Sequence, residues 1–205
     1  MMIVVIFSSG YGHFLRFGPL ICLHKLYLMA IDLPQNLVTL KDATRSLLND
    51  YHSLLELCDK AMAEADQPHT RPEHADLIGH ARAFATEVRS YLKERVTTQI
   101  PYLNELAEKS STGHDCAQCS GKCDLQHTMR LYELNKSIEK ILNATEYIYT
   151  EFEHVYKSFG DNTEIRSLHS VIMLLNHFLR TVLATEVAVL VPRIKEAQRE
   201  INAHS

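Results

Sequence analysis

Two stretches with the same internal spacing decide the fold: Ile100-Pro101-Tyr102-Leu103-Asn104-Glu105 and Val191-Pro192-Arg193-Ile194-Lys195-Glu196. Each follows, at the same distance, a pair of residues that also correspond, Tyr91-Leu92 in the first case and Val182-Leu183 in the second. Both stretches lie at the ends of long segments with helical periodicity. The chain therefore looks like two similar helical hairpins joined end to end.

Working outward from these stretches, apolar residues recur at spacings of three and four, which is typical of amphipathic helices. We predict four such helices, at about residues 36–65, 72–109, 129–159 and 165–194. Pro101 is expected to kink or interrupt the second helix, and Gly160-Asp161-Asn162 is expected to form the turn after the third. The sequence predicts no strand. The expected fold is all-α: an up-down-up-down four-helix bundle with a Cys/His-rich loop between helices 2 and 3.

Length and composition are those of one soluble globular domain. The chain has 205 residues, of which 46% are hydrophobic and 22% charged, enough for a single well-buried core. Its net charge of −4 and its scattered lysines and arginines argue against nucleic-acid binding. The cysteine count of five is odd and three of them are clustered, unlike a secreted disulfide framework. We therefore expect a reducing, cytoplasmic location.

The first 28 residues differ from the rest of the chain. Apolar runs at residues 1–7 and 19–28 flank a glycine-containing stretch, and each is too short to span a bilayer. No basic region precedes the first run, which argues against a signal peptide. We predict that residues 1–28 are an apolar extension outside the fold and that residues 29–205 form the bundle. The alternative for the extension is a tail that binds a membrane surface or a partner.

The loop between the second and third helices carries the densest chemical signal. Cys116, Cys119, Cys123 and His127 follow one another at short spacings, and His114 lies just before them. Three thiolates and an imidazole are an accepted ligand set for structural zinc. Three thiolates at these spacings could also hold an iron–sulfur cluster. A reversible Cys116–Cys119 disulfide and a cysteine-rich loop without a ligand remain as alternatives.

The pattern of the whole chain resembles that of the hemerythrin-like (HHE cation-binding) family. Tyr51-His52-Ser53-Leu54-Leu55 is similar to that family's first-helix histidine segment, and Ile100-Pro101-Tyr102-Leu103 and Val191-Pro192-Arg193-Ile194 are similar to its two Phe-Pro helix ends. The resemblance covers about residues 37–200. It implies a four-helix bundle with iron in its interior, and a role in oxygen, nitric oxide or redox sensing.

Carried over residue by residue, the resemblance gives candidate ligands and a departure. His52 and Glu186 match the family's ligand types, and Tyr91 offers a phenolate oxygen. Where the family has His-x-x-x-Glu on helices two and four, this chain has Tyr91 and Arg95, then Val182 and Glu186. A guanidinium repels metal cations and pairs with carboxylates. We therefore predict that Arg95 and Glu186 face each other where relatives hold metal.

Two functions follow from these patterns. No nucleophile–base set, phosphate loop or dinucleotide fingerprint is present in the sequence, so catalysis is not indicated. The first function is a hemerythrin-like metal-binding module that senses or binds a small diatomic ligand. The second is a regulatory or interaction bundle with a degenerate central site, in which the Cys/His loop holds zinc or an iron–sulfur cluster and the partner is a protein. The sequence does not set the oligomeric state.

Overall fold

The computed structural model describes residues 39–67, 72–112, 123–160 and 162–203. Within these ranges the chain is helical almost throughout and contains no strand, which confirms the all-α prediction. The α-helices are α2 (Leu40–Ala65), α3 (Ala75–Glu94), α4 (Ile100–Thr112), α5 (Cys123–Ser158), α6 (Thr163–Thr185) and α7 (Val191–Ala203). A 3₁₀ turn, η2 (Pro72–His74), precedes α3. The extension predicted at residues 1–28 and the predicted bundle start at residue 29 lie outside the described residues.

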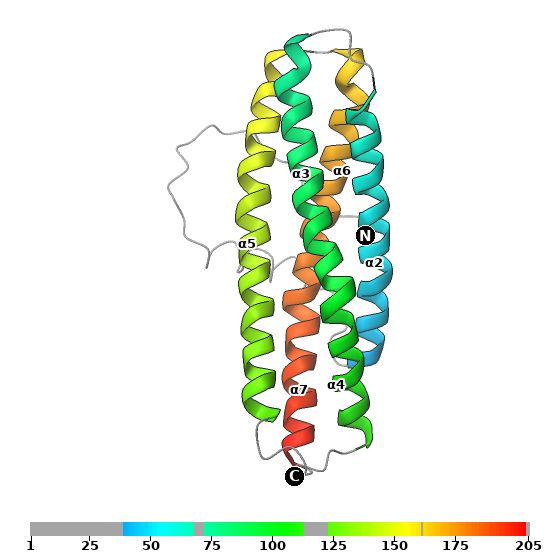
Figure 1. Cartoon of the computed structure of the whole chain (residues 1–205), viewed down its shortest axis with the longest axis vertical. Coiled ribbons are helices and arrows are strands. Elements are labelled where there is room, and N and C mark those ends of the chain that lie inside the picture. The colour runs from blue at the N-terminus through cyan, green and yellow to red at the C-terminus, as the bar shows by residue number, and fades with distance from the viewer. Residues whose placement is uncertain (1–38, 68–71, 113–122, 161, 204–205) are drawn as a thin grey trace, which may run out of the picture.

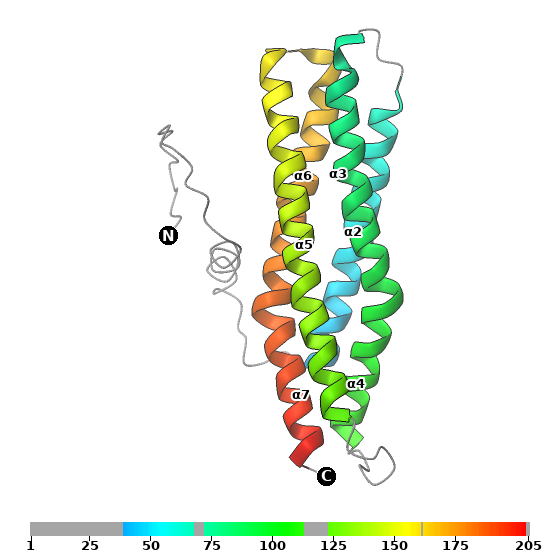
Figure 2. The same cartoon turned by 60° about the vertical axis from the view of Figure 1, so that its left-hand side comes forward.

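Four helical rods lie side by side in Figures 1 and 2. The rods are α2, α3 continued by α4, α5, and α6 continued by α7. α3 packs closely on both α2 and α5, α2 also packs on α6, and α4 packs on α7. A single core of buried apolar side chains from all four rods fills the space between them. Burial of this apolar surface is the main force that holds the rods together.

The start of α2 is set by Thr39. Its hydroxyl oxygen accepts a hydrogen bond from the Asp42 N–H at 3.1 Å and donates one to the Asp42 carboxylate at 2.6 Å. This is an N-cap, which satisfies a backbone donor that the helix itself leaves free. The helix therefore begins four residues later than the Asn36 start predicted from periodicity.

The turn between α5 and α6 lies where the sequence predicts it. Gly160 has a φ of 65°, a conformation that favours glycine because it has no Cβ. Asn162 then caps α6, with its side-chain oxygen accepting from the Glu164 N–H at 2.9 Å. The same Asn162 side chain lies 3.1 Å from Nε2 of His74, at the start of α3. One side chain thus ends the turn and links two helices.

The rods formed by α3/α4 and by α6/α7 each contain a π-helical segment, η3 (Arg95–Gln99) and η4 (Glu186–Leu190). In both, the N–H of the residue after the segment bonds five residues back, Ile100 to Arg95 and Val191 to Glu186. Each segment begins six residues before a proline, Pro101 or Pro192. The wider π turn lets the chain pass a proline, which lacks an N–H and crowds the preceding turn of an α-helix.

Two predictions from the sequence concern these segments. The kink or interruption predicted at Pro101 corresponds to η3, which interrupts the regular α-helix directly before this proline, while α4 continues through Pro101 itself. The correspondence between the two hairpins extends to the backbone, because both π segments stand in the same place relative to their prolines.

One helical stretch, Thr163–Ile201, is long and apolar enough to cross a membrane by length and composition alone. Most of its apolar window is buried against the other rods. The core helix of a soluble protein meets the same criterion, so the feature is weak evidence for a membrane span.

Candidate functional site

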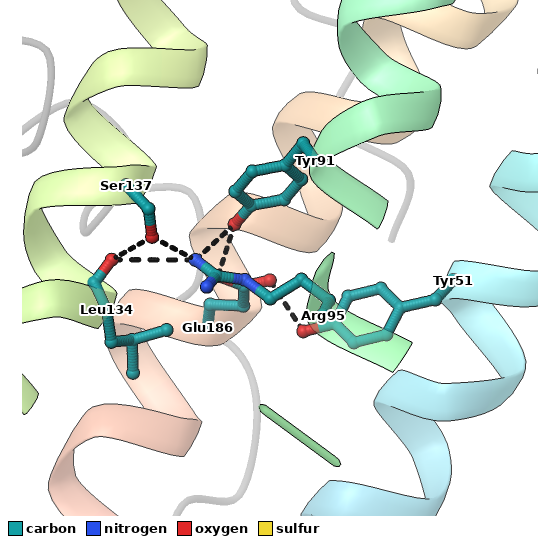
Figure 3. Close-up of polar contacts among 6 residues, drawn as sticks. All are labelled: Tyr51, Tyr91, Arg95, Leu134, Ser137 and Glu186. Atoms are coloured by element: carbon teal, nitrogen blue, oxygen red, sulfur yellow. Dashed lines mark hydrogen bonds and ion pairs between the residues drawn. The ribbon is translucent and has the colours of Figure 1, made fainter. Parts of the chain in front are cut away.

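A cluster of polar side chains lies in the apolar interior, and every rod contributes to it (Figure 3). Tyr51 comes from α2, Tyr91 from α3, Arg95 from η3, Ser137 from α5 and Glu186 from η4. Arg95 is 2% exposed and Glu186 is fully buried. Charged side chains are rarely buried to this extent unless they are paired, so the cluster is the most unusual feature of the interior.

Glu186 is at the centre of the hydrogen bonds. Its Oε1 accepts a hydrogen bond from the Tyr51 hydroxyl at 2.6 Å, and its Oε2 accepts one from the Tyr91 hydroxyl at 2.7 Å. Nη2 of Arg95 lies 3.3 Å from Oε2. Both side-chain oxygens of Glu186 are therefore occupied as hydrogen-bond acceptors. The prediction that Arg95 and Glu186 face each other is confirmed.

Arg95 is held by more than its ion pair. Its Nη2 also donates to the Tyr91 hydroxyl and to Ser137 Oγ, both at 2.8 Å, and lies 3.5 Å from the Leu134 carbonyl oxygen. The Ser137 hydroxyl in turn donates to that carbonyl at 2.8 Å. The guanidinium carbon lies 4.4 Å from the centre of the Tyr91 ring, a cation–π distance. These contacts fix the guanidinium between α3 and α5.

Burial and the carboxylate keep the two phenols protonated. Burial is the largest cause that raises the pKa of Tyr51 well above its ordinary value, and the nearby Glu186 raises it further. The pKa of Tyr91 is raised well above its ordinary value for the same two reasons. Burial lowers the pKa of Arg95, but Glu186 and the two phenols outweigh it, and the net pKa shift is upward. The cluster therefore holds one cation, one anion and two neutral phenols.

Of the three interior ligands suggested by the resemblance, the structure brings together two. Glu186 and Tyr91 are in contact, but His52 is exposed on the outer side of α2. Tyr51 points inward in its place. The reason is helical geometry, because consecutive residues are rotated by about 100° and the buried stripe runs through Tyr51 and Leu54. The interior position that the resemblance suggests for His52 is therefore taken by the neighbouring Tyr51.

The sequence contained a signal for Tyr51. It belongs to the same apolar stripe as Leu47 and Leu54, so periodicity alone assigns it to the interior. Ser137 offered no such signal, since a serine beside an apolar stripe is usually a surface residue. Its role depends on the position of Arg95 on a different rod, which the local pattern does not contain.

The Cys/His loop lies largely outside the described residues. Cys116, Cys119 and His114 are outside them altogether. Cys123 and His127 fall in the first turns of α5, which begins earlier than the Met129 start predicted for this helix; their side chains are not described. Metal binding by these five residues stays a prediction from their spacing.

Across the residues that the structure describes, no three histidine, cysteine or acidic side chains gather as a metal site would require. The central cluster has a single carboxylate, two phenols and a guanidinium. Its oxygens and Nη2 of Arg95 bond to one another, whereas Nε of Arg95 is buried without a hydrogen-bond partner among the described residues. The cluster can hold the four rods together at one level of the bundle, because each rod contributes at least one of the hydrogen-bonded side chains.

Comparisons with protein-family models, with curated proteins and with solved structures found no match to this chain.

Proposed function

We propose that this chain is a non-catalytic regulatory or interaction module, built as a hemerythrin-like up-down-up-down four-helix bundle whose central metal position has been taken over by Arg95 and Glu186. One observation carries the proposal. The guanidinium of Arg95 lies at the middle of the bundle, bonded to the same carboxylate and phenol that the resemblance suggests as iron ligands.

Electrostatics supports a centre without metal. A guanidinium stays charged in a protein and repels a metal cation at close range. Glu186 already accepts from both phenols, and those phenols have raised pKa values, so they are poor sources of phenolate ligands. A metal would have to displace Arg95 from four oxygen contacts. The alternative function, in which interior iron binds a diatomic ligand, is not supported by these contacts or by the raised pKa values of the phenols.

The hemerythrin-like architecture is supported by the repeat of the two halves and by contacts at one end of the bundle. Both halves carry a π segment at the same distance from a proline. The end of α2 is bonded to α3 through Arg82 and the Ala65 carbonyl oxygen, at 3.0 Å. The start of α3 is bonded to the start of α6 through His74 and Asn162. These links are those expected between neighbouring ends in an up-down-up-down chain.

The Cys/His loop is then where we propose that the chain holds metal. The spacing of Cys116, Cys119, Cys123 and His127, with His114 in reserve, suits zinc or an iron–sulfur cluster. Metal at this point would join the second helical rod to the third and stabilise the joint between the two halves. Cysteines that bind metal must stay reduced, so we propose a cytoplasmic location. We propose a protein partner, because the net charge of −4 and the scattered lysines and arginines do not favour nucleic acid. A membrane partner is not part of the proposal.

Elemental analysis of protein purified without oxygen tests the proposal. We expect one zinc ion or one iron–sulfur cluster per chain, lost in Cys119→Ser and kept in both Glu186→Gln and the buried-cysteine control Cys58→Ser. Two irons per chain that vanish in Glu186→Gln would overturn the metal-free centre. A native chain without metal, or metal unaffected by Cys119→Ser, would overturn the loop assignment.

A further inference from the structure

We propose that the interior cluster is a binding site for one planar, singly charged cation, and that the guanidinium of Arg95 is the occupant supplied by the chain itself. This inference rests on the proposed metal-free centre and names the chemistry that the centre recognises. It assigns to the cluster a ligand class that excludes metal ions.

The charge of the site sets the charge of its ligand. Nη2 of Arg95 meets one carboxylate oxygen, from Glu186, and three neutral oxygens. The neutral oxygens belong to Tyr91, Ser137 and the Leu134 carbonyl. Without Arg95 the surroundings would carry one negative charge in a buried setting, which a monocation neutralises. A divalent or trivalent ion would leave net charge in the interior, which is costly.

Ionised phenols could in principle raise the negative charge of the site and so admit a metal. Tyr51 and Tyr91 oppose this, because each donates a hydrogen bond to Glu186 and burial disfavours the phenolate anion by raising the pKa of each phenol. A second negative charge beside Glu186 would also meet direct repulsion. The donor set therefore stays at one charge.

The shape of the site selects a flat cation. The ring of Tyr91 lies against the guanidinium carbon at 4.4 Å, while the oxygens of Tyr91, Ser137 and Glu186 surround one of its nitrogens. A delocalised planar cation can stack on a ring and donate hydrogen bonds from its edge at once. A compact ammonium or alkali-metal ion is more strongly hydrated and has no flat face to lie against the ring, so it fits this site less well.

The test removes the guanidinium from the chain and offers it back in solution. In full-length Arg95→Ala, we expect millimolar guanidinium chloride to raise the midpoint of thermal unfolding in a saturable way. The expected rise is about 3–6 °C at a guanidinium concentration about ten times Kd. Urea has almost the same size and shape but no charge, so at equal concentration it should give no such rise.

Two further variants separate the site from general effects. Arg89→Ala removes an arginine of the same helical rod whose side chain is 42% exposed and pairs with Asp59 at 3.1 Å; guanidinium should not stabilise it. Arg95→Ala/Glu186→Gln removes the charge that the ligand would neutralise, and guanidinium should not stabilise it either. If Arg95→Ala is unfolded in buffer, recovery of its helical circular dichroism with guanidinium, and not with urea, is the expected result.

The opposite outcomes overturn the inference. It fails if guanidinium gives Arg95→Ala neither a saturable rise nor recovered helicity, if urea or Na⁺ acts equally well, or if the double variant still responds. It also fails if Zn²⁺ or Fe²⁺ stabilises Arg95→Ala and guanidinium does not. The metal content of the native chain is a separate measurement, so interior iron there would refute the proposed function whatever the variants do.

Discussion

Arg95 and Glu186 hold equivalent positions in the two halves of the chain, and they meet in the interior with 3.3 Å between Nη2 and Oε2. Each is the first residue of a π-helical segment that begins six residues before a proline. The two halves therefore have the same backbone form at this position, but one half places a cation there and the other an anion. Neither charge is accessible to water, so each depends on the other for compensation.

Removing the carboxylate should destabilise the fold strongly. In Glu186→Gln the guanidinium of Arg95 remains buried without a counter-charge, and one of the two phenols loses its acceptor, because glutamine keeps a single side-chain oxygen. We expect the free energy of unfolding to fall by about 3–5 kcal/mol. Urea unfolding followed by circular dichroism measures this change.

A matched control for that change lies one segment later in the chain. Glu196 pairs with Arg193 on the surface of α7 and is 53% exposed. Because solvent screens such pairs, Glu196→Gln should lower the free energy of unfolding by less than about 1 kcal/mol. Equal losses in the two variants would contradict the claim that Arg95 depends on Glu186.

Replacing both charges together should cost less than the two single replacements combined. Arg95→Met/Glu186→Leu fills the volume with apolar atoms and leaves no buried charge. Similar replacements of buried ion pairs are often neutral or stabilising. Tyr51 and Tyr91 still lose their acceptor here, so we expect the double variant to lose less stability than the sum of the two single replacements, without returning to native stability. The measurement is a double-mutant cycle with Arg95→Met, Glu186→Leu and the pair. Additive losses would show that the two residues act independently.

Local periodicity was enough to predict the helical class and the approximate extent of each helix. The stripe through Leu47 and Leu54 is one example, since it assigned a buried face that the structure contains. It could not predict the π segment before Pro101, because a single proline does not reveal whether a π turn accommodates it. The repeat with Pro192 was visible in the sequence, but its backbone form depends on hydrogen bonds that the residue types do not specify.

The pairing of Arg95 with Glu186 was predictable because both stand at matching places in a repeated pattern and carry opposite charge. Tyr51 lies on the apolar face predicted for this helix, but its hydrogen bond to Glu186 depends on how α2 packs against η4. Ser137 could not have been found, because a contact between α5 and η3 depends on how the rods pack. Long-range geometry thus decided the parts of the site that the sequence left open.

Each phenol that bonds to Glu186 should contribute separately to stability. Tyr51→Phe and Tyr91→Phe each remove one hydrogen bond to a buried carboxylate and leave the ring in place. Such bonds to charged groups contribute about 1.5–3 kcal/mol, so we expect losses of that size in urea unfolding. Tyr147→Phe is the control, because its side chain is 69% exposed, and it should change stability by less than about 0.5 kcal/mol.

Cys58 should resist thiol reagents as long as the chain is folded. Its side chain is fully buried on α2, and burial is the main cause that raises the pKa of its thiol to about 12. The thiolate is the reactive form, so at pH 8 the folded chain offers almost none at this position. Mass spectrometry should find the Cys58 peptide unlabelled by iodoacetamide in buffer and labelled in urea. Labelling at the rate of free cysteine in buffer would contradict this burial.

The same phenols should make the fold sensitive to strong base. Burial, and then Glu186, raise the pKa of Tyr51 and Tyr91 well above their ordinary value, which is about 10. A pKa raised by folding means that the stabilisation is fully present below pH 10 and is lost as the pH rises from there through the folded-state pKa values. Thermal unfolding midpoints should therefore fall above pH 10, and fall less steeply in Tyr51→Phe/Tyr91→Phe. The control is again Tyr147→Phe, which should follow the native curve; an unchanged slope in the double variant would show that other groups govern alkaline unfolding.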